Sequence, residues 1–326
     1  MSGTSIPLTL AHSPDPDDAF MWWPLTGKIN PDGSQQLGEA GKPRIDTGRF
    51  QFKALPADIH VLNKRAAREG DLEITALSAR AYADVKDRYI ITACGGSFGD
   101  GYGPKVVVRS DQNADSMKLS CEDCLKKPGV RIAVPGLQTT AFLLLGLVLG
   151  SEIAKQRDRF FEMPFEQIIG AVARREVDAG LVIHEGQLTF ADAGLRMMLD
   201  VGAWWKAKTG LLTPLGVNAI RRDLDRAHGP GTVTEIAKLL KQSVAYSMEH
   251  RDESTRYTLP FALANVSRGG ETGEAPTLER VERYCRMYVT PETLDMGERG
   301  RDALQLLFTE GFKAGLCPEA GIVDLA

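Results

Sequence analysis

The sequence has no excess of basic residues, no long apolar run and few cysteines. Its 326 residues include 39 Lys and Arg against 43 Asp and Glu, giving a net charge of −4. Nucleic acids and anionic membrane surfaces favour basic patches, so this charge balance argues against both as partners. The longest apolar run, Ala141–Leu149, falls well short of the roughly 20 residues that cross a bilayer. The sequence therefore predicts neither nucleic-acid binding nor membrane insertion.

The five cysteines, an odd number, do not indicate a disulfide framework. Cys121 and Cys124 have the spacing of a redox or zinc pair, but no second Cys or His pair lies nearby, so we expect no metal site. Met1–Thr9 contains no Lys or Arg and no long apolar core, which is unlike a secretory signal, and we expect a cytoplasmic protein. Gly95–Pro104 carries five glycines, but no Gly-Lys-Ser/Thr follows them, which excludes a P-loop.

Apolar runs alternate with helical spacing, which predicts an α/β fold. We expect strands at Ile6–Ala11, Arg49–Leu55, Leu72–Leu77, Tyr89–Ala93, Lys105–Arg109, Val130–Val134, Leu181–Ile183, Leu199–Val201 and Gly216–Arg221. Helices are expected at Asp58–Arg68, Gln138–Gly150, Phe165–Glu176 and over most of the chain after Thr232. Residues 30–48, 110–129 and 267–276 are rich in Gly, Pro or polar residues and are expected to be surface insertions or links.

The pattern restarts near Lys105 and again near Leu215, each time through a strand without a long linker. This indicates a lobe inserted into another lobe, joined by two crossing strands, with a cleft between them. We expect residues 1–105 and 215–326 to form lobe 1 and residues 106–214 to form lobe 2. Clefts at domain interfaces are favoured small-molecule sites.

The candidate centre of this cleft is His184, which follows the apolar run Leu181–Ile183 where a buried strand leaves its sheet. Ligands of open α/β sheets collect outside the carboxyl ends of strands, and histidine suits proton transfer near neutral pH. Glu185, the next residue, is an alternative proton carrier or an orienting group. His12 is a competing candidate, likewise at a strand end.

Other polar residues lie where strands meet helices. Thr139 and Thr140 follow a strand and a Pro-Gly turn at a helix start, where unpaired N–H groups favour a carboxylate or phosphate. Thr139 can equally be only an N-cap. Ser78 ends a strand of the other lobe and can add a second hydroxyl, while Asp18 either caps the first helix or faces the cleft. Trp204–Trp205 can wall an aromatic ligand or pack the hinge.

Five segments resemble the menaquinone-biosynthesis enzymes of the futalosine route, the 1,4-dihydroxy-6-naphthoate synthases. They are Ser13-Pro14-x-Pro16-x-Asp18-x-Phe20, Leu77-Ser78 with Tyr82, Ala133–Gly136 with Thr139-Thr140, Ile183-His184-Glu185, and Trp204-Trp205-x-x-Lys208-Thr209-Gly210-Leu211-x-x-Pro214-Leu215-Gly216. The last segment is the most specific, and the resemblance covers most of the chain apart from the insertions and the Gly-rich link.

The resemblance implies the fold of type II periplasmic solute-binding proteins, used here by an enzyme. It implies a lyase that converts cyclic dehypoxanthine futalosine, a small aromatic carboxylate, to 1,4-dihydroxy-6-naphthoate without a metal or organic cofactor. His184 maps onto the general base of the family. The substrate contacts map onto Ala76, Leu77, Ser78, Thr139, Thr140 and Asn63. The resemblance leaves the oligomeric state open, a homodimer included.

The chain departs from the family in two segments. Family members usually have Cys-Pro-Asn-Asp-Thr-Phe where this chain has Asp15–Phe20, and Lys-Leu-Ser-Tyr where it has Ala76–Ala79. An added acid and a lost lysine near the cleft would weaken the attraction for an anionic substrate. Two other functions compete with this interpretation: the sister chorismate dehydratase, and a solute-binding protein that holds an organic anion unchanged.

Overall fold

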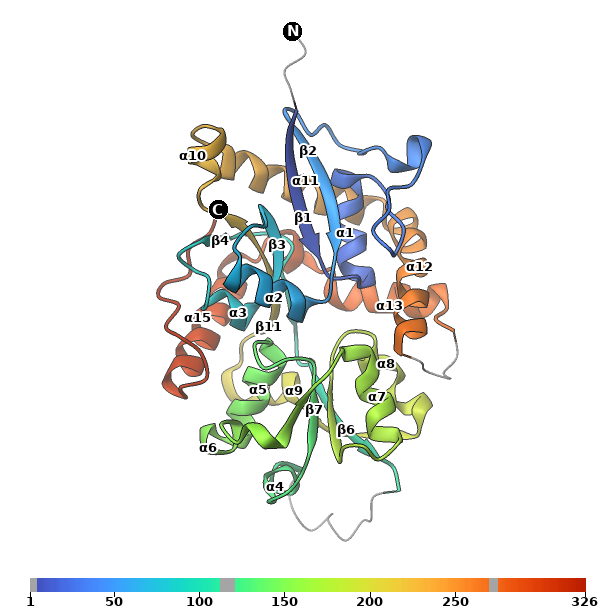
Figure 1. Ribbon diagram of the computed structural model, residues 1–326, viewed down its shortest axis with the longest axis vertical. Helices are drawn as coiled ribbons and strands as arrows, with labels where there is room; N and C mark the ends of the chain where they lie inside the picture. The colour runs from blue at the N-terminus through green and yellow to red at the C-terminus, as the bar shows by residue number, and fades with distance from the viewer. Residues whose placement is uncertain (1–4, 112–120, 270–274) are drawn as a thin grey trace.

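The computed structural model describes residues 5–111, 121–269 and 275–326, which form two lobes stacked along the long axis of the molecule (Figure 1). The upper lobe is built on a mixed sheet of order β2-β1-β3-β11-β4, in which β5 also pairs with β11. The lower lobe is built on a second sheet of order β10-β6-β9-β7-β8. The predicted two-lobed α/β architecture is therefore confirmed.

The first sheet contains β1 (Ile6–His12), β2 (Phe50–Pro56), β3 (Ile74–Ser78), β4 (Tyr89–Ile91), β5 (Ser97–Gly99) and β11 (Thr213–Arg221). Its helices are α1 (Pro16–Thr26), α2 (Ile59–Arg68), α3 (Ala79–Tyr82), α10 (Leu224–His228), α11 (Thr232–Glu249), α12 (Arg251–Gly269), α13 (Leu278–Tyr288), α14 (Pro291–Leu294) and α15 (Gly297–Lys313). Strand β1 runs parallel to β2 and β3, whereas β11 runs antiparallel to β3, β4 and β5.

The second sheet contains β6 (Lys105–Arg109), β7 (Ile132–Val134), β8 (Phe160–Glu162), β9 (Ala179–Val182) and β10 (Leu195–Asp200). Its helices are α4 (Cys121–Lys126), α5 (Thr140–Leu149), α6 (Ser151–Ala154), α7 (Phe165–Ala173), α8 (Gly186–Thr189) and α9 (Val201–Thr209). Strand β7 is parallel to β8 and β9, so the chain leaves β7 and β9 at the same edge of the sheet, toward the first lobe.

Helix α1 lies in the core of the first lobe. All of its residues are buried, including Phe20, Trp22 and Trp23, and it packs against α11, α12 and α13. A helix that buries large apolar side chains on every side is stable only when other elements surround it. Pro16 occupies the first helical turn, where its missing N–H costs no hydrogen bond. The acidic start of α1 is thereby fixed at the junction between the lobes.

Two short connections join the lobes, one from β5 to β6 and one from α9 to β11. They are packed tightly, because a Cβ atom at Gly202 would lie 2.2 Å from the carbonyl oxygen of Tyr102. We propose the division expected from the sequence, residues 1–105 with 215–326 as lobe 1 and residues 106–214 as lobe 2. Sheet membership supports it, with β11 beginning slightly earlier, at Thr213.

Some element boundaries were predicted wrongly. The strand expected at Leu199–Val201 begins at Leu195 and ends at Asp200, and Val201 opens α9 instead. The reason is a helix cap: the Asp200 side chain accepts a hydrogen bond from the backbone N–H of Ala203 at 2.9 Å. Strands β5 and β8 were not predicted, since strands of three residues carry too little periodicity to detect.

Within the described ranges, every helix is too short or too polar to cross a bilayer. The expected insertion at 110–129 lies partly outside the described residues, as does the expected link at 267–276. The side chain of Cys121 also lies outside them, so the interpretation of Cys121 and Cys124 stays an expectation.

Candidate active site

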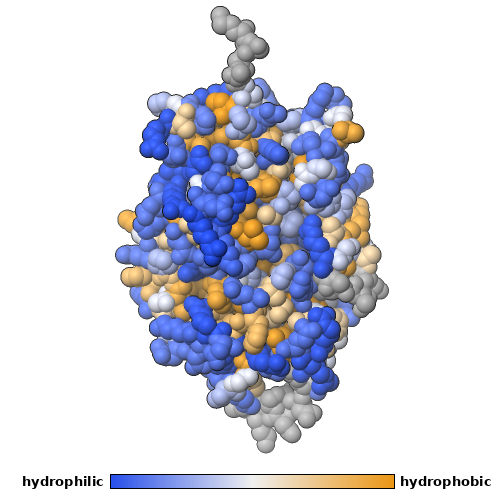
Figure 2. Space-filling view, viewed as in Figure 1, coloured by the Kyte–Doolittle hydropathy of each residue, from blue (hydrophilic) through white to orange (hydrophobic). Residues whose placement is uncertain are grey.

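A cavity of about 100 Å³ lies between the two lobes. Residues from the ends of β1, β3, β7 and β9 line it, as expected for ligand sites of open α/β sheets. Its polar lining consists of Ser13, Asp15, Asp17, Asp18, Ser78, Ser97, Thr139, Thr140, His184, Gln187, Asn218, Tyr284 and Tyr288. On the outer surface, polar residues cover most of the face in Figure 2, and apolar residues gather near the level where the lobes meet.

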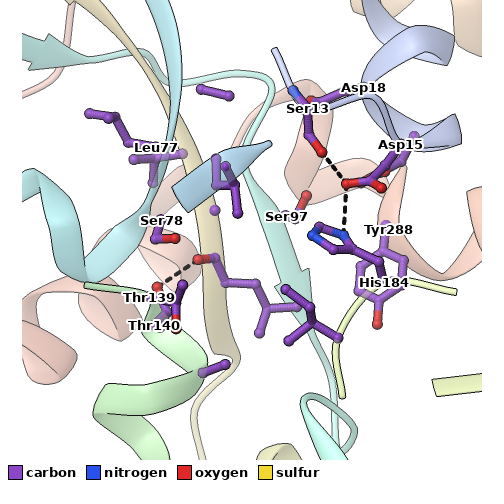
Figure 3. Close-up of a pocket in the computed structure, with 18 of the residues that line it drawn as sticks. Ser13, Asp15, Asp18, Leu77, Ser78, Ser97, Thr139, Thr140, His184 and Tyr288 are labelled. Carbon is purple, nitrogen blue, oxygen red and sulfur yellow. Dashed lines mark hydrogen bonds and ion pairs between the residues drawn. The ribbon is translucent and has the colours of Figure 1, made fainter. Parts of the chain in front are cut away.

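The structure brings together every site residue predicted from the sequence except Asn63. The cavity is lined by Asp18, Ala76, Leu77, Ser78, Thr139, Thr140 and His184. Figure 3 shows Ser78, Thr139 and Thr140 on one side of the cavity, with Asp15 and His184 on the other. The cavity therefore has a hydroxyl-rich side and an ionisable side.

On the hydroxyl-rich side, both threonine hydroxyls have backbone partners. Thr139 is the N-cap of α5: its Oγ1 accepts from the N–H of Phe142 at 3.2 Å and donates to the carbonyl oxygen of Gly136 at 2.7 Å. Thr140 Oγ1 donates to the carbonyl oxygen of Leu215 at 2.7 Å and accepts from the N–H of Arg80 at 3.1 Å. The hydroxyls thus hold the helix start in place, and the first backbone N–H groups of α5 are the donors suited to an anion.

Asn63 lies behind Ser78, within α2. Its Nδ2 donates to Ser78 Oγ at 3.0 Å, and its Oδ1 accepts from the Ser78 N–H at 2.9 Å. Asn63 is only 1% exposed, so it fixes Ser78 and does not itself line the cavity. Because Asn63 donates to Ser78 Oγ, the hydroxyl hydrogen of Ser78 can point to a ligand.

On the ionisable side, His184 follows β9 with a positive φ of 52°, an uncommon conformation for a residue other than glycine. Its Nδ1 lies 2.9 Å from Asp15 Oδ2, and its ring meets Phe165 edge-on at a centroid distance of 4.7 Å. Its Nε2 is buried and has no hydrogen-bond partner within the described residues. The imidazole is therefore held at one nitrogen and unpaired at the other.

Asp15 is fully buried and forms several polar contacts. Ser13 Oγ donates to the Oδ2 atom that also faces His184, and Asn265 Nδ2 lies 3.3 Å from Oδ1. Asn265 Nδ2 also lies 3.3 Å from Glu185 Oε1. Tyr284, from α13, donates to Asp17 Oδ1 at 3.1 Å. Side chains from the end of β1, from α12 and from α13 thus surround the histidine.

Burial and mutual repulsion change the acidity of these groups. Burial, together with repulsion from Asp15, raises the pKa of Asp17 to about 6 and that of Glu185 to about 8. Burial, with repulsion from Asp17 and Asp15, raises the pKa of Asp18 well above its ordinary value. Burial lowers the pKa of His184, but the ion pair with Asp15 outweighs it and raises that pKa to about 10. At neutral pH Glu185 is therefore mostly uncharged, and protonated His184 is paired with Asp15.

This charge balance bears on one of the two departures from the family pattern, the segment Asp15–Phe20. The added acid, Asp15, pairs with His184 and so does not present an isolated negative charge to a ligand. The competing histidine, His12, is 2% exposed and absent from the cavity lining, with Nδ1 2.7 Å from the carbonyl oxygen of Ser13. Burial lowers its pKa to about 4, so it is a neutral structural residue at physiological pH.

Sequence reasoning missed Asp15, Asn265 and Tyr284 as members of the site. Asp15 was visible only as a departure within a motif. Asn265 and Tyr284 come from α12 and α13, far along the chain, and neither stands in a recognisable motif. Of the adjacent tryptophans, Trp205 packs the hinge: it is buried and its Nε1 donates to the carbonyl oxygen of Leu212 at 2.8 Å.

Comparisons with known proteins identify the family of the chain. The model of a family described as menaquinone biosynthesis matches residues 8–313. A 1,4-dihydroxy-6-naphthoate synthase of Thermus thermophilus is 34% identical over 310 residues, 95% of each chain. The enzyme of the same name from Streptomyces coelicolor is 31% identical over 320 residues, 98% of each chain.

Solved structures confirm the fold. A protein from Archaeoglobus fulgidus is similar with a TM-score of 0.74 at 38% identity, over 95% of this chain and 98% of that one. An alkanesulfonate-binding protein from Xanthomonas axonopodis has a TM-score of 0.62 at 15% identity, over 99% of this chain and 98% of the other. The second likeness shows the two-lobed solute-binding architecture alone. On the evidence of the family model and of its full-length relatives, the chain belongs to the menaquinone-biosynthesis family, as a member of the 1,4-dihydroxy-6-naphthoate synthase group.

Proposed function

We propose that this protein is a carbon–carbon lyase that converts cyclic dehypoxanthine futalosine to 1,4-dihydroxy-6-naphthoate, with His184 as the general base and without a metal or organic cofactor. The observation that carries the proposal is the position of His184 across the interlobe cavity from the start of α5. This arrangement places a proton acceptor opposite an anion-binding helix start, as the fragmentation of an aromatic carboxylate requires.

The substrate carboxylate would lie at the hydroxyl-rich side of the cavity. The N–H groups at the start of α5 and the hydroxyl of Ser78 supply donors there, and the helix dipole favours a negative charge. Ala76 and Leu77 offer an apolar wall beside Ser78 for the aromatic ring. Binding the carboxylate at this side would direct the remainder of the molecule toward His184.

At the ionisable side, His184 Nε2 would remove a proton from the carbon next to the activated centre. Nε2 is the nitrogen not engaged by Asp15, and it has no hydrogen-bond partner within the described residues. Because burial raises the pKa values of Asp18 and Glu185, these two carboxyl groups would repel the negative charge that develops on the substrate less than ordinary carboxylates would. Contacts between the lobes on both sides of the cavity, such as Gln187 with Tyr288 at 2.6 Å, would keep the intermediate from solvent.

The test is incubation of the purified protein with cyclic dehypoxanthine futalosine, with detection of 1,4-dihydroxy-6-naphthoate by mass spectrometry. His184→Ala should abolish turnover and keep substrate binding within about tenfold of the parent. His12→Asn is the matched control, because His12 is buried nearby but does not line the cavity, and it should retain turnover. Unchanged turnover in His184→Ala would overturn the role of His184. Consumption of chorismate in a parallel assay would favour the dehydratase instead.

A further inference from the structure

Among the ionisable groups of the cavity, Asp15 is the one in direct contact with His184 through its carboxylate. The 2.9 Å contact joins Asp15 Oδ2 to Nδ1, and the side chain of Asp15 is 1% exposed against 20% for His184. An isolated buried carboxylate costs several kcal/mol, so such a group persists only where donors surround it. The groups that donate hydrogen bonds to the Asp15 carboxylate therefore indicate how it is held and what it does.

Three donors converge on this one carboxylate. Ser13 Oγ and His184 Nδ1 share Oδ2, while Asn265 Nδ2 approaches Oδ1 at 3.3 Å. They come from three separate parts of the chain, the end of β1, the turn after β9 and α12. The carboxylate can therefore neither rotate nor move without losing a partner, and its lone pair at Oδ2 is fixed toward Nδ1.

The histidine is equally constrained. Its backbone has a φ of 52°, and its ring lies edge-on against Phe165 at 4.7 Å. A carboxylate acceptor at Nδ1 requires a hydrogen on Nδ1, which leaves Nε2 as the nitrogen that can accept a proton when the ring is neutral. The same arrangement of acid and imidazole orients the base in other enzymes.

We propose that Asp15 is a positioning residue that holds His184 with its hydrogen on Nδ1 and its Nε2 lone pair available to the substrate in the cavity. The proposal rests on the function proposed above for His184. It goes beyond that function by assigning a role to a residue that does not itself remove the proton. Ser13 and Asn265 support Asp15 in turn, as the shell that keeps the carboxylate in place.

The proposal predicts a distinct pH dependence. Among the described residues, the titratable groups that contact His184 or interact with its charge are Asp15, Asp17 and Asp18 at the start of α1, Asp58 before α2, Glu185 beside it and Tyr284 of α13. Asp15 is the strongest of the acids that raise the pKa of His184, which is about 10. Below this pKa only the neutral fraction of His184 can act as a base, so log kcat/KM of the parent should rise with a slope of about 1 between pH 7 and 9.

The decisive variant is Asp15→Asn, which has nearly the same shape. Its amide oxygen keeps an acceptor for Asn265, and its NH2 group replaces Oδ2, where the hydroxyl of Ser13 can turn to accept from it. Its amide would donate to Nδ1, so the neutral ring would carry its hydrogen on Nε2 and lose the lone pair that faces the substrate. Burial would then lower the pKa of His184, and the slope of log kcat/KM between pH 7 and 9 should fall to about 0. Nitrogen-15 NMR above pH 10, where the imidazole of the parent is neutral as well, should show the tautomer reversed.

Two further variants keep the test decisive. Asp58→Asn, which neutralises another acid near His184, should leave the tautomer as in the parent. Asn265→Ala, which frees Asp15 without touching the ring of His184, should weaken the preference for Nδ1–H and so covers the case in which Asp15→Asn does not fold. If the tautomer in Asp15→Asn and in Asn265→Ala matches the parent, the proposal is wrong.

The two proposals fail in different ways. If the parent produces no 1,4-dihydroxy-6-naphthoate, the proposed function fails, and NMR on the free protein still decides whether Asp15 sets the tautomer of His184. If the parent is active and Asp15→Asn loses rate without any change of slope or tautomer, Asp15 has a structural role alone. That result would overturn the positioning role and leave the proposed function standing.

Discussion

The turn between β7 and α5 allows a sharp test of how the two lobes fit together. Gly136 lies in this turn with a φ of 144°, which residues with side chains rarely adopt. A Cβ atom built at Gly136 would lie 2.2 Å from Nδ1 of His60, a residue of α2 in the other lobe. The substitution Gly136→Ala would therefore strain the turn and drive a methyl group into the opposite lobe.

The expected loss of stability has two parts. Forcing alanine into this backbone conformation costs about 1–3 kcal/mol. Overpacking against the His60 ring costs about another 1–3 kcal/mol, because the contact is well below van der Waals distance and the ring is anchored in α2. Together they predict that Gly136→Ala lowers the free energy of unfolding by about 2–6 kcal/mol.

Urea unfolding followed by tryptophan fluorescence measures the loss, and two variants separate its parts. Gly229→Ala is the matched control: its φ is 102° and a Cβ atom there meets nothing within 4 Å, so it should show the backbone cost alone. Adding His60→Ala to Gly136→Ala should remove the overpacking and recover about 1–3 kcal/mol. The KM for the substrate should also rise, since the turn positions Thr139.

The reasoning would be refuted by either of two results. If Gly136→Ala loses no more stability than Gly229→Ala, the contact between the lobes at His60 does not exist in solution. If the loss is larger but His60→Ala recovers none of it, the clash is with another group, and the relative position of the lobes described here is wrong.

Three further changes test other parts of the structure. Gly202→Ala should destabilise the protein by about 2–4 kcal/mol in urea unfolding, because its Cβ would lie 2.2 Å from the rigid backbone of Tyr102. A loss of stability below about 1 kcal/mol would contradict the tight packing of the two connections between the lobes. Thr140→Val should lower the free energy of unfolding by about 1–3 kcal/mol, whereas Thr140→Ser keeps the hydroxyl bond to Leu215 and should be about as stable as the parent. If the two variants are equally stable, the hydroxyl does not link the lobes. The pKa of His12 is lowered to about 4 in the folded protein, so below pH 6.5 the unfolded state binds the extra proton first and stability falls as the pH falls from 6.5 to 4. Urea unfolding at pH 7 and at pH 4 should show that His12→Asn loses about 3 kcal/mol less stability than the parent between these two pH values. An equal loss of stability in variant and parent would disprove this prediction.

Local patterns in the sequence predicted the elements that present the site. The apolar run before His184 predicted a buried strand with a polar residue at its end, and β9 ends at Val182, two residues before His184. The Pro-Gly turn followed by two threonines predicted a capped helix start, and Thr139 caps α5. These predictions succeeded because strand burial and helix capping depend on neighbours within a few residues.

Roles were harder to predict than positions. Asn63 was expected to contact the substrate, but both ends of its amide are bonded to Ser78. Which groups a side-chain amide meets depends on the packing of α2 against β3, and the order of residues in α2 does not reveal it. Thr140 likewise bonds to backbone atoms of Leu215 and Arg80, which are distant in the chain.

By itself, the sequence determined the α/β class, the lobe pattern, the family and the strand end that carries His184, because periodicity and motifs are local properties of the chain. Only the tertiary structure decided the state of His184. Its partner Asp15 comes from the end of β1, and Asn265, which approaches that partner, comes from α12. Acidity depends on burial and on charges within a few ångströms, and the folded chain sets both by bringing remote residues together.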